Sequence, residues 1–220
     1  MSLVLPANSS IPAHTHPSVD DVYAVSEKLE KAGCSFKKKP DEGRMKGLAF
    51  VYDPDQYWVE IVKRGEGANI DNEMNFSQTM LRVKDPKKSL EFYKKMGMKL
   101  LEERHFDDFS LFFLGSSNVP DVDKASLLFP PVLELTHNHG TESDEDFQHY
   151  HGNEEGRQGF GHIGFLVDDV YTACDSIREM GYGFRKVSNA WQHTFVCGWF
   201  QCFSYCSREI FSFRNRMVAR

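Results

Sequence analysis

The chain lacks the features of a membrane, secreted or disulfide-rich protein. None of its 220 residues belong to a run of 18 apolar residues, so no membrane-spanning helix is predicted. The first residues, MSLVLPANSSIPAH, lack the basic start and the continuous apolar core of a signal peptide. The five cysteines are an odd number, and three of them lie between Cys197 and Cys206, which does not indicate a disulfide framework. We therefore expect a cytoplasmic protein without a membrane partner.

An excess of positive charge is also lacking. The formal net charge is -6, and basic runs such as KKSLEFYKK stand beside acidic residues. A nucleic-acid surface needs clustered positive charge to bind phosphates, so no nucleic-acid partner is expected. A hydrophobic content of 40% and an aromatic content of 13% are ordinary for a globular protein with a buried core.

What the chain does contain is an internal repeat. The segments SVDDVYAVSEKLEKAGCSFKKK (18–39) and LVDDVYTACDSIREMGYGFRKV (166–187) align without a gap and share VDDVY and a later glycine. Each copy predicts a helix that begins after aspartate residues and ends at Gly33 or Gly181, followed by a strand. The two segments therefore indicate a duplicated structural unit.

Between the two copies lies a unit with a different pattern. NFSQTMLRV alternates as a strand, and DPKKSLEFYKKMG predicts a helix with Pro86 in its first turn and Gly97 behind it. MKLLEERHF, FSLFFLGS and SLLFPPVLELTHN then read as three further strands. The predicted element order of this unit is βαβββ.

The two copies continue differently, and this sets the predicted domain organisation. After the first copy, LAFVY and YWVEIV predict two strands, but IPAHTHPS contains Pro17 and does not predict a strand before it. The last 34 residues contain no Lys or Asp and look foreign to the rest. We predict the following parts: 1–17, an aberrant segment; 18–64, the C-terminal part of one βαβββ module; 65–74, a linker; 75–139, a complete module; 140–158, a polar connector; 159–186, the N-terminal part of a further module; and 187–220, an aberrant tail.

Four residues at the ends of predicted strands could carry chemistry. They are Gln78, Glu134, Glu60 and His162, and the last opens the apolar stretch GFGHIGFLVDDVY. A carboxylate inside an apolar strand is costly unless it is paired or bound to a metal ion. From the residues alone, an outward-facing strand position, a structural ion pair and a satisfied core histidine remain open alternatives.

Several motifs resemble glyoxalase I, the eukaryotic type of lactoylglutathione lyase. They are QTMLRVKDPKKSLEFYKKMGM, LELTHNHGTE, GFGHIGFLVDDVY and KKKPDEGRMKGLAFVYDPDQYWVEIV. The resemblance covers about residues 19 to 186 and implies an α+β fold of paired βαβββ modules of the vicinal oxygen chelate type. The order of units, with unfinished modules at both ends, resembles a segment of the double-length, four-module form.

The resemblance also implies a metal site between modules. Gln78 and Glu134 from one module would bind one divalent metal ion together with a histidine and a glutamate of the type of His162 and Glu60. Zinc is the expectation for the eukaryotic type, with nickel or cobalt left open. The implied reaction isomerises the hemithioacetal of glutathione and methylglyoxal to S-D-lactoylglutathione, with Glu60 as the proton shuttle and the metal stabilising an enediolate.

The histidine of this site is an open question. His162 stands nine residues before Tyr171, and the residue nine before Tyr23 is His14, so His14 is the candidate ligand from the first module. The partners that His162 would need are not found in the chain.

The substrate contacts implied by the resemblance are spread over the chain. Arg82 and Asn138 match positions that bind glutathione, and Lys38 and Met45 match a loop that clamps its glycyl end. Arg157 departs from the pattern, because an arginine usually precedes GFGH directly and this chain has Gln158 there. Its contact with glutathione is therefore in doubt.

Two alternatives to an active enzyme remain. One is a metal-free binding module of the same fold, and the other is a catalytically inactive fragment. The four-module form is expected to be monomeric, whereas a chain with unfinished modules is expected to self-associate through unpaired strand edges.

Overall fold

A computed structural model of the chain describes residues 13–65, 73–116, 131–186 and 196–197. The chain divides into two compact units, Met1–Tyr150 and His151–Arg220, which are described separately below. Most of the predicted N-terminal segment 1–17, of the predicted linker 65–74 and of the predicted tail 187–220 lies outside the described residues. No helix in the described part is long and apolar enough to cross a membrane.

The first unit consists of two modules with the same order of elements. The first module comprises β1 (Ala13–Val19), α1 (Val22–Lys31), β2 (Phe36–Lys38), β3 (Ala49–Tyr52) and β4 (Trp58–Lys63). The second comprises β5 (Asn75–Arg82), α2 (Pro86–Lys95), β6 (Met98–His105), β7 (Phe109–Ser116) and β8 (Val132–Asn138), and is followed by the short 3-10 helix η2 (Thr141–Ser143). The predicted fold of paired βαβββ modules is confirmed.

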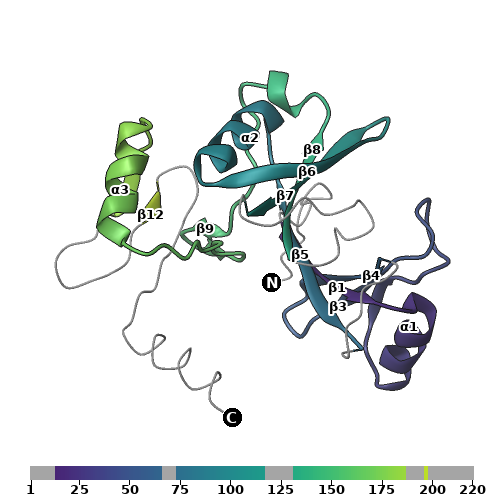
Figure 1. Cartoon of the computed structure of the whole chain (residues 1–220). Helices are drawn as coiled ribbons and strands as arrows, with labels where there is room; N and C mark the ends of the chain where they lie inside the picture. Colours follow the sequence, from purple (N-terminus) through teal and green to yellow (C-terminus); the bar gives the residue numbers. More distant parts are fainter. Residues whose placement is uncertain (1–12, 66–72, 117–130, 187–195, 198–220) are drawn as a thin grey trace, which may run out of the picture. The chain divides into compact units, whose positions relative to one another are not determined.

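The two modules share one eight-stranded sheet (Figure 1). Its strand order is β2-β3-β4-β1-β5-β8-β7-β6. The first strand of each module runs parallel to the last strand of the same module, and β1 and β5 join the modules as an antiparallel pair. The strand order therefore reads the same from both edges, and the modules are related by an approximate two-fold axis between β1 and β5.

Strand β1 corrects the predicted start of the first module. Residues 18–64 were expected to hold only the C-terminal part of a module, because Pro17 argued against a strand; the expectation that no strand precedes the helix was wrong. The ladder between β1 and β5 shifts its register between His16 and Pro17. A proline lacks the N–H of a regular ladder but is tolerated at such an irregularity. The first module thus has all five of its elements.

Both helices of this unit begin and end as their sequences predict. The side chain of Asp21 accepts hydrogen bonds from the backbone N–H groups of Tyr23 and Ala24, and Asp85 caps α2 in the same way. Gly33 and Gly97 follow the helices with φ of 87° and 84°. Only glycine adopts this left-handed conformation without steric cost, which ends the helix at a defined residue.

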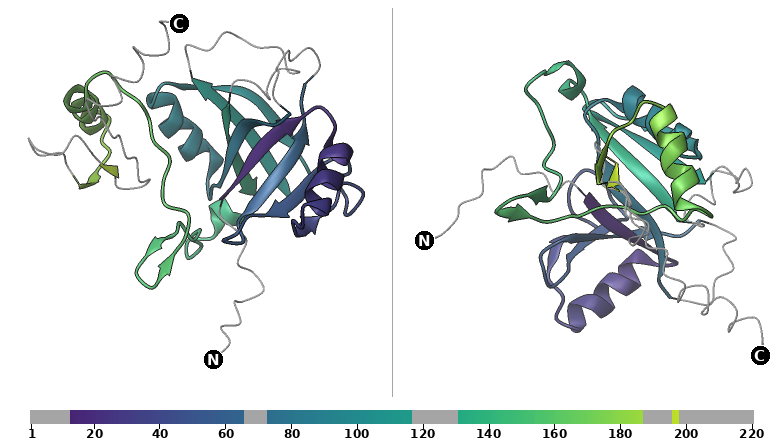
Figure 2. Two further views of the ribbon diagram at one scale, coloured as in Figure 1. Left: turned by 90° about the horizontal axis from the view of Figure 1, so that it is seen from below. Right: turned by 90° about the vertical axis from the view of Figure 1, so that its left-hand side faces the viewer.

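The core of the first module lies between α1 and the sheet. Val19 and Ile61 from the strands are fully buried and belong to one cluster with Val22 and Val25 of α1. Figure 2 shows α1 against the strands of the first module and α2 against those of the second. One face of the sheet is therefore covered, which leaves the other face of the central strands for function.

A buried arginine fixes the edge of this core where β1, β4 and β5 meet. Arg64 is 4% exposed, and its guanidinium donates to the carbonyl of Ser18 at 3.2 Å and to Oδ1 of Asn75 at 2.9 Å. It also forms an ion pair with Asp20 at 3.1 Å. These bonds satisfy polar groups that the ends of the three strands leave inside the protein.

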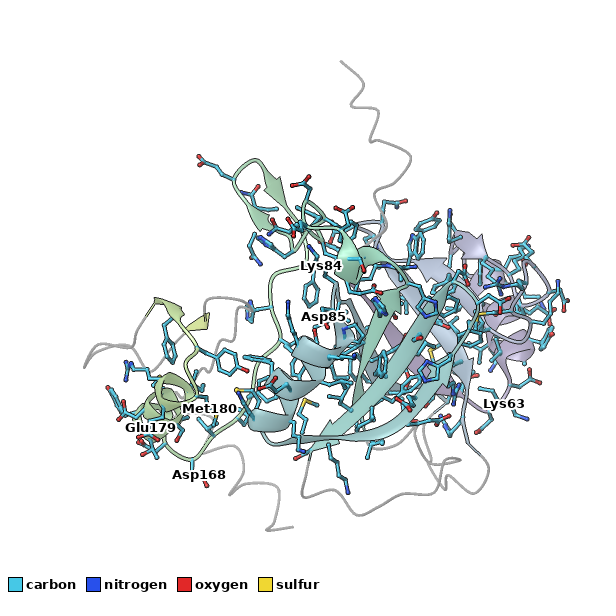
Figure 3. The ribbon with its side chains drawn as sticks, turned by 90° about the horizontal axis from the view of Figure 1, so that it is seen from above. Lys63, Lys84, Asp85, Asp168, Glu179 and Met180 are labelled. Carbon is cyan, nitrogen blue, oxygen red and sulfur yellow. The ribbon has the colours of Figure 1, made fainter. Side chains whose placement is uncertain are left out.

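The antiparallel junction also sets where the strand ends lie. Figure 3 labels Lys63 at the end of β4, and Lys84 and Asp85 just after β5, on well-separated parts of the first unit. Because β4 is parallel to β1 while β5 is antiparallel to it, the C-terminal ends of β4 and β5 point in opposite directions. The helices of the two modules consequently begin at opposite ends of the sheet.

In its described residues, the second unit has a helix of the predicted kind and only short strands. Its elements are β9 (Asn153–Glu154), β10 (Arg157–Gln158), α3 (Val170–Glu179), β11 (Phe184–Lys186) and β12 (Val196–Cys197), and Figure 3 labels Asp168, Glu179 and Met180 around α3. The buried strand expected to open at His162 is absent from the described residues, where only Ile163 forms a β-bridge. Leu166 is 90% exposed. That prediction was wrong because a strand is stable only beside partner strands, and the sequence pattern alone does not supply them.

Candidate active site

The candidate ligands lie on the four central strands, β4, β1, β5 and β8. Across the antiparallel junction, His16 is paired with Gln78. In the parallel ladder between β1 and β4, Thr15 is paired with Val59 and Ser18 with Val62. The same register places His16 beside Glu60. Residues paired directly across strands share one face of a sheet, so positions 60, 16 and 78 lie in a row on the same face.

Glu134 joins this row from the neighbouring strand β8. It is paired with Met80, which lies two residues after Gln78 and therefore on the same face. The Gln78 side chain donates a hydrogen bond from Nε2 to Oε2 of Glu134. Thr136 donates from Oγ1 to Oε1 of Glu134 at 2.9 Å. The predicted Gln and Glu donors of the second module are thus in contact.

The symmetry of the sheet identifies the matching position in the first module. His14 is paired with Met80 and His16 with Gln78, so the two-fold relation exchanges position 14 with 78 and position 16 with 80. On β8, Glu134 stands beside Met80, and on β4, Glu60 stands beside His16. Position 14 in the first module is therefore equivalent to Gln78 in the second module, and Glu60 is equivalent to Glu134.

The oxygen donors of the site are buried. Glu60 is 8%, Gln78 5% and Glu134 5% exposed. Two carboxylates and one amide withdrawn from water on one sheet face are a donor set that a divalent cation would stabilise. Among the described residues, no three side chains of the types His, Cys, Asp and Glu gather closely enough to hold a metal ion. Gln78 is not of these types, and the set of oxygen donors with position 14 fits a divalent ion.

Cationic side chains accompany both carboxylates. Burial lowers the pKa of Lys38, and the charge of Glu60 opposes this shift. Burial likewise lowers the pKa of Arg82, and the charge of Glu134 opposes it. Each glutamate thus has one basic residue of its own module within electrostatic range, Lys38 in the first and Arg82 in the second.

The predicted glutathione contacts of the second module lie together. Arg82 donates from Nη1 to Oδ1 of Asn138 at 2.6 Å, where β5 and β8 end side by side. The Nε atom of Arg82 is buried without a hydrogen-bond partner among the described residues. A planar guanidinium with free donors can bind a carboxylate, and the asparagine side chain holds it in place.

The predicted loop contacts of the first module are Lys38, the last residue of β2, and Met45 in the loop between β2 and β3. Lys38 donates from Nζ to the carbonyl of Leu48 at 2.7 Å, and Met45 is 41% exposed. Arg44 in the same loop forms an ion pair at 3.0 Å with Asp108, which lies between β6 and β7. The loop is therefore attached to both modules of the unit.

Two predicted site residues lie in the second unit. His162 is exposed and lies outside any strand, and Arg157 is the first residue of β10, paired with Glu154. His162 and Arg157 thus belong to the second unit, whereas Glu60, Gln78 and Glu134 belong to the first.

The sequence prediction missed His16. It lies in register with both Glu60 and Gln78, although only His14 matched the repeat. Residues two positions apart in a strand lie on the same face of the sheet, so the spacing of His14 and His16 could have indicated that both lie on the same face. That signal could be used only after the segment had been recognised as a strand.

Comparison with known proteins identifies the family. The family model of the Glyoxalase/Bleomycin resistance protein/Dioxygenase superfamily matches residues 6–61 and 75–196. The chain belongs to this superfamily, as its paired βαβββ modules indicate.

Relatives of known name define the similarity further. The chain is 40% identical to "Lactoylglutathione lyase" of Schizosaccharomyces pombe over 175 residues, which are 77% of this chain and 56% of that protein. It is 43% identical to "Glyoxalase I" of Saccharomyces cerevisiae over 76% of this chain and 52% of that protein. The crystal structure of glyoxalase I from Zea mays has a TM-score of 0.60 at 26% identity and covers 84% of this chain and 61% of that one. The predicted resemblance to glyoxalase I is confirmed, and the chain spans about half the length of these two yeast relatives.

Proposed function

We propose that the first unit isomerises the hemithioacetal of glutathione and methylglyoxal to S-D-lactoylglutathione. The observation that carries this proposal is that positions 14 and 60 of the first module and Gln78 and Glu134 of the second lie on one sheet face, with each pair related to the other by the two-fold axis between the modules. The names of the two yeast relatives, lactoylglutathione lyase and glyoxalase I, support it.

The proposed site holds one divalent metal ion, with zinc as the first expectation and nickel or cobalt as alternatives. His14, Glu60, Gln78 and Glu134 would be its protein ligands. When bound, the ion would polarise the oxygens of the substrate and stabilise negative charge that develops on them. Three oxygen donors and one imidazole differ from a closed structural zinc site, and Gln78 and Glu134 hold each other in place for binding.

Glu60 is the proposed acid and base. Its side chain is buried on the site face, and the reaction needs a group that takes a proton from one carbon of the substrate and returns it to the next. Lys38 is the basic residue of the same module within electrostatic range of it.

The glutathione part of the substrate would bind on both sides of this group. Arg82 and Asn138 would hold a carboxylate at the end of β5, and Lys38 and Met45 would bind the glycyl end from the loop. Arg157 lies in the other unit, and its contact with glutathione stays a prediction.

The test is to separate catalysis from binding with Glu60→Gln. We expect the isomerisation rate, followed by absorbance, to fall by about 10²- to 10⁴-fold, because the amide cannot accept the proton. Binding of S-hexylglutathione should change far less. Glu103→Gln is the matched control, because Glu103 is an exposed glutamate of strand β6.

Three other results would contradict the proposal. Equal losses of rate and binding would make Glu60 a binding residue rather than the proton shuttle. Binding of S-hexylglutathione by a wild-type chain that has no turnover and no divalent metal would indicate a metal-free binding module. Neither binding nor turnover by the wild-type chain would indicate a catalytically inactive fragment.

A further inference from the structure

A group of imidazoles lies at the edge of the second module, on the other face of the sheet from the candidate ligands. Ser110 of β7 is paired with His137 of β8, whereas Phe113 is paired with Glu134. Because successive residues of a strand point to opposite faces, Ser110 and Glu134 lie on opposite faces of the sheet. The residues around Ser110 therefore form a site separate from the candidate active site.

Two histidines converge on the hydroxyl group of Ser110. His105, the last residue of β6, has its Nδ1 atom 2.9 Å from Ser110 Oγ, and His139, which follows β8, has its Nε2 atom 2.8 Å from the same oxygen. Ser110 is buried, whereas both histidines are exposed. Two imidazole nitrogens thus meet at one oxygen atom in a place that solvent can reach.

The outer nitrogen of each histidine faces an oxygen acceptor. Nδ1 of His139 lies 3.2 Å from the backbone carbonyl oxygen of Asp107. Nε2 of His105 lies 3.7 Å from Oε1 of Glu103. A neutral imidazole has one N–H group, and these acceptors favour that N–H on the outer nitrogen. The two inner nitrogens, which face the serine, then both carry a lone pair.

Ser110 satisfies only one of these two lone pairs. Its hydroxyl group has one proton, so it donates to one inner nitrogen and turns an oxygen lone pair toward the other. A metal cation bound by both nitrogens would remove this mismatch. Histidines that bind a metal ion almost always hold their other nitrogen on a carboxylate, a backbone carbonyl or water, and His105 and His139 already face such acceptors.

The hairpin between β6 and β7 holds the two histidines in position. The backbone N–H of His139 donates to the carbonyl of Asp108 at 3.1 Å, which ties the end of β8 to the hairpin turn. The turn begins directly after His105 and is closed by a 2.9 Å hydrogen bond from the N–H of Phe106 to the carbonyl of Phe109. The rings of these two phenylalanines are stacked, with centroids 4.5 Å apart. Both imidazoles are therefore carried by ordered backbone.

We propose that His105 and His139 bind a divalent transition-metal ion of the zinc type, with Ser110 Oγ as a third, weaker ligand. Ligand atoms that lie about 2.1 Å from one metal ion are about 3.0–3.4 Å apart. The observed distances of 2.9 Å and 2.8 Å therefore require only a small displacement. Imidazole nitrogens favour zinc, copper or nickel over calcium or magnesium.

This ion should bind less tightly than the ion of the proposed active site. Among the described residues, no third side chain of the types His, Cys, Asp and Glu completes the set, so water would fill the remaining positions. The ligands also include no carboxylate, so the protein supplies no charge of its own to the ion. Titration is for this reason a better measurement than metal content after dialysis.

The experiment is calorimetric titration of the whole, previously dialysed chain with zinc chloride. We expect a saturable site, and the ring nitrogen signals of His105 and His139 should shift in heteronuclear NMR spectra as that site fills. His105→Ala and His139→Ala should each weaken zinc binding at this site by at least about tenfold, because each removes a ligand.

The matched control is His151→Ala, which removes an exposed histidine of the second unit. It should leave the titration unchanged. Equal weakening by His151→Ala would mean that zinc binds to exposed imidazoles in general and would overturn the proposal. Absence of saturable zinc binding, or wild-type affinity in both His105→Ala and His139→Ala, would overturn it as well.

Discussion

The two copies of the repeat have similar helices but differ in the segment before the helix, where AHTHPSV (13–19) forms β1 and GHIGFLV (161–167) forms no strand. In the first copy, β1 lies between β4 and β5, and Ser18 is 0% exposed. In the second copy, Leu166 occupies the equivalent position and is 90% exposed. The helices of the two copies are alike, since α1 and α3 have ten residues each and begin after an aspartate cap. The copies thus share their helix and the short strand after it, β2 and β11, but not the strand before the helix.

The difference separates elements that depend on nearby residues from elements that depend on residues far apart in the chain. The helix cap, the apolar spacing and the terminating glycine all lie within a dozen residues, so the helix forms in either copy. The strand needs neighbours, and β1 has them in β4 and β5, with Arg64 bonded to the ends of all three. The segment before α3 has no such neighbours among the described residues and forms only a β-bridge at Ile163.

The largest effect should come from a charge at the last residue of the strand. Val19 is fully buried, whereas its counterpart Val167 is half-buried. Val19→Asp should lower the free energy of unfolding by about 3 kcal/mol or more, because it buries an unpaired carboxylate. Val167→Asp should cost less than about 1 kcal/mol. Denaturant unfolding followed by circular dichroism measures both, and equal effects would show that the second strand is also packed.

An intermediate effect should follow from exchanging the residues one position earlier. Ser18→Leu places a large side chain at a fully buried position and should cost about 1–3 kcal/mol through overpacking. Leu166→Ser removes an exposed apolar side chain, should change stability by no more than about 0.5 kcal/mol, and should reduce self-association. The checks are chemical unfolding and light scattering. A strong destabilisation by Leu166→Ser would contradict the exposure of this position.

The smallest effect should come from the helix caps, and it should be the same in both copies. Asp21 accepts from the N–H of Ala24 at 3.0 Å, and Asp169 accepts from the N–H of Thr172 at 2.7 Å. Asp21→Ala and Asp169→Ala should each speed amide exchange in the first helical turn by roughly fivefold. The hydrogen bond from Thr172 lowers the pKa of Asp169, so the cap is present above the ordinary aspartate pKa and is lost as pH falls. A much larger effect in α1 alone would mean that its cap depends on the sheet.

The sequence predicted the helices, the order of the complete module and the residues Gln78 and Glu134. These follow from caps, periodicity and the resemblance to glyoxalase I. It failed at β1, because Pro17 was judged without the register shift that accommodates it, and at His162, because a strand was inferred without its partners. Both failures concern contacts between segments far apart in the chain.

The candidate site was predictable in its residue types but not in its arrangement. The pairing of His14 with Met80 and of His16 with Gln78 depends on which strands meet at the module junction. That junction joins residues about 60 positions apart, and no local pattern sets its register. The equivalence of position 14 with Gln78 therefore emerges only from the sheet.

The most direct test of the proposed site compares the two equivalent histidines. The metal content of the purified chain, measured by elemental analysis after dialysis, should fall from about one divalent ion per chain to near zero in His14→Ala. The same measurement on His162→Ala should give the wild-type value, because the proposed ligand set contains His14 and not His162. Wild-type metal content in His14→Ala, or loss of the ion in His162→Ala, would contradict the assignment of the site to the junction of β1 and β5.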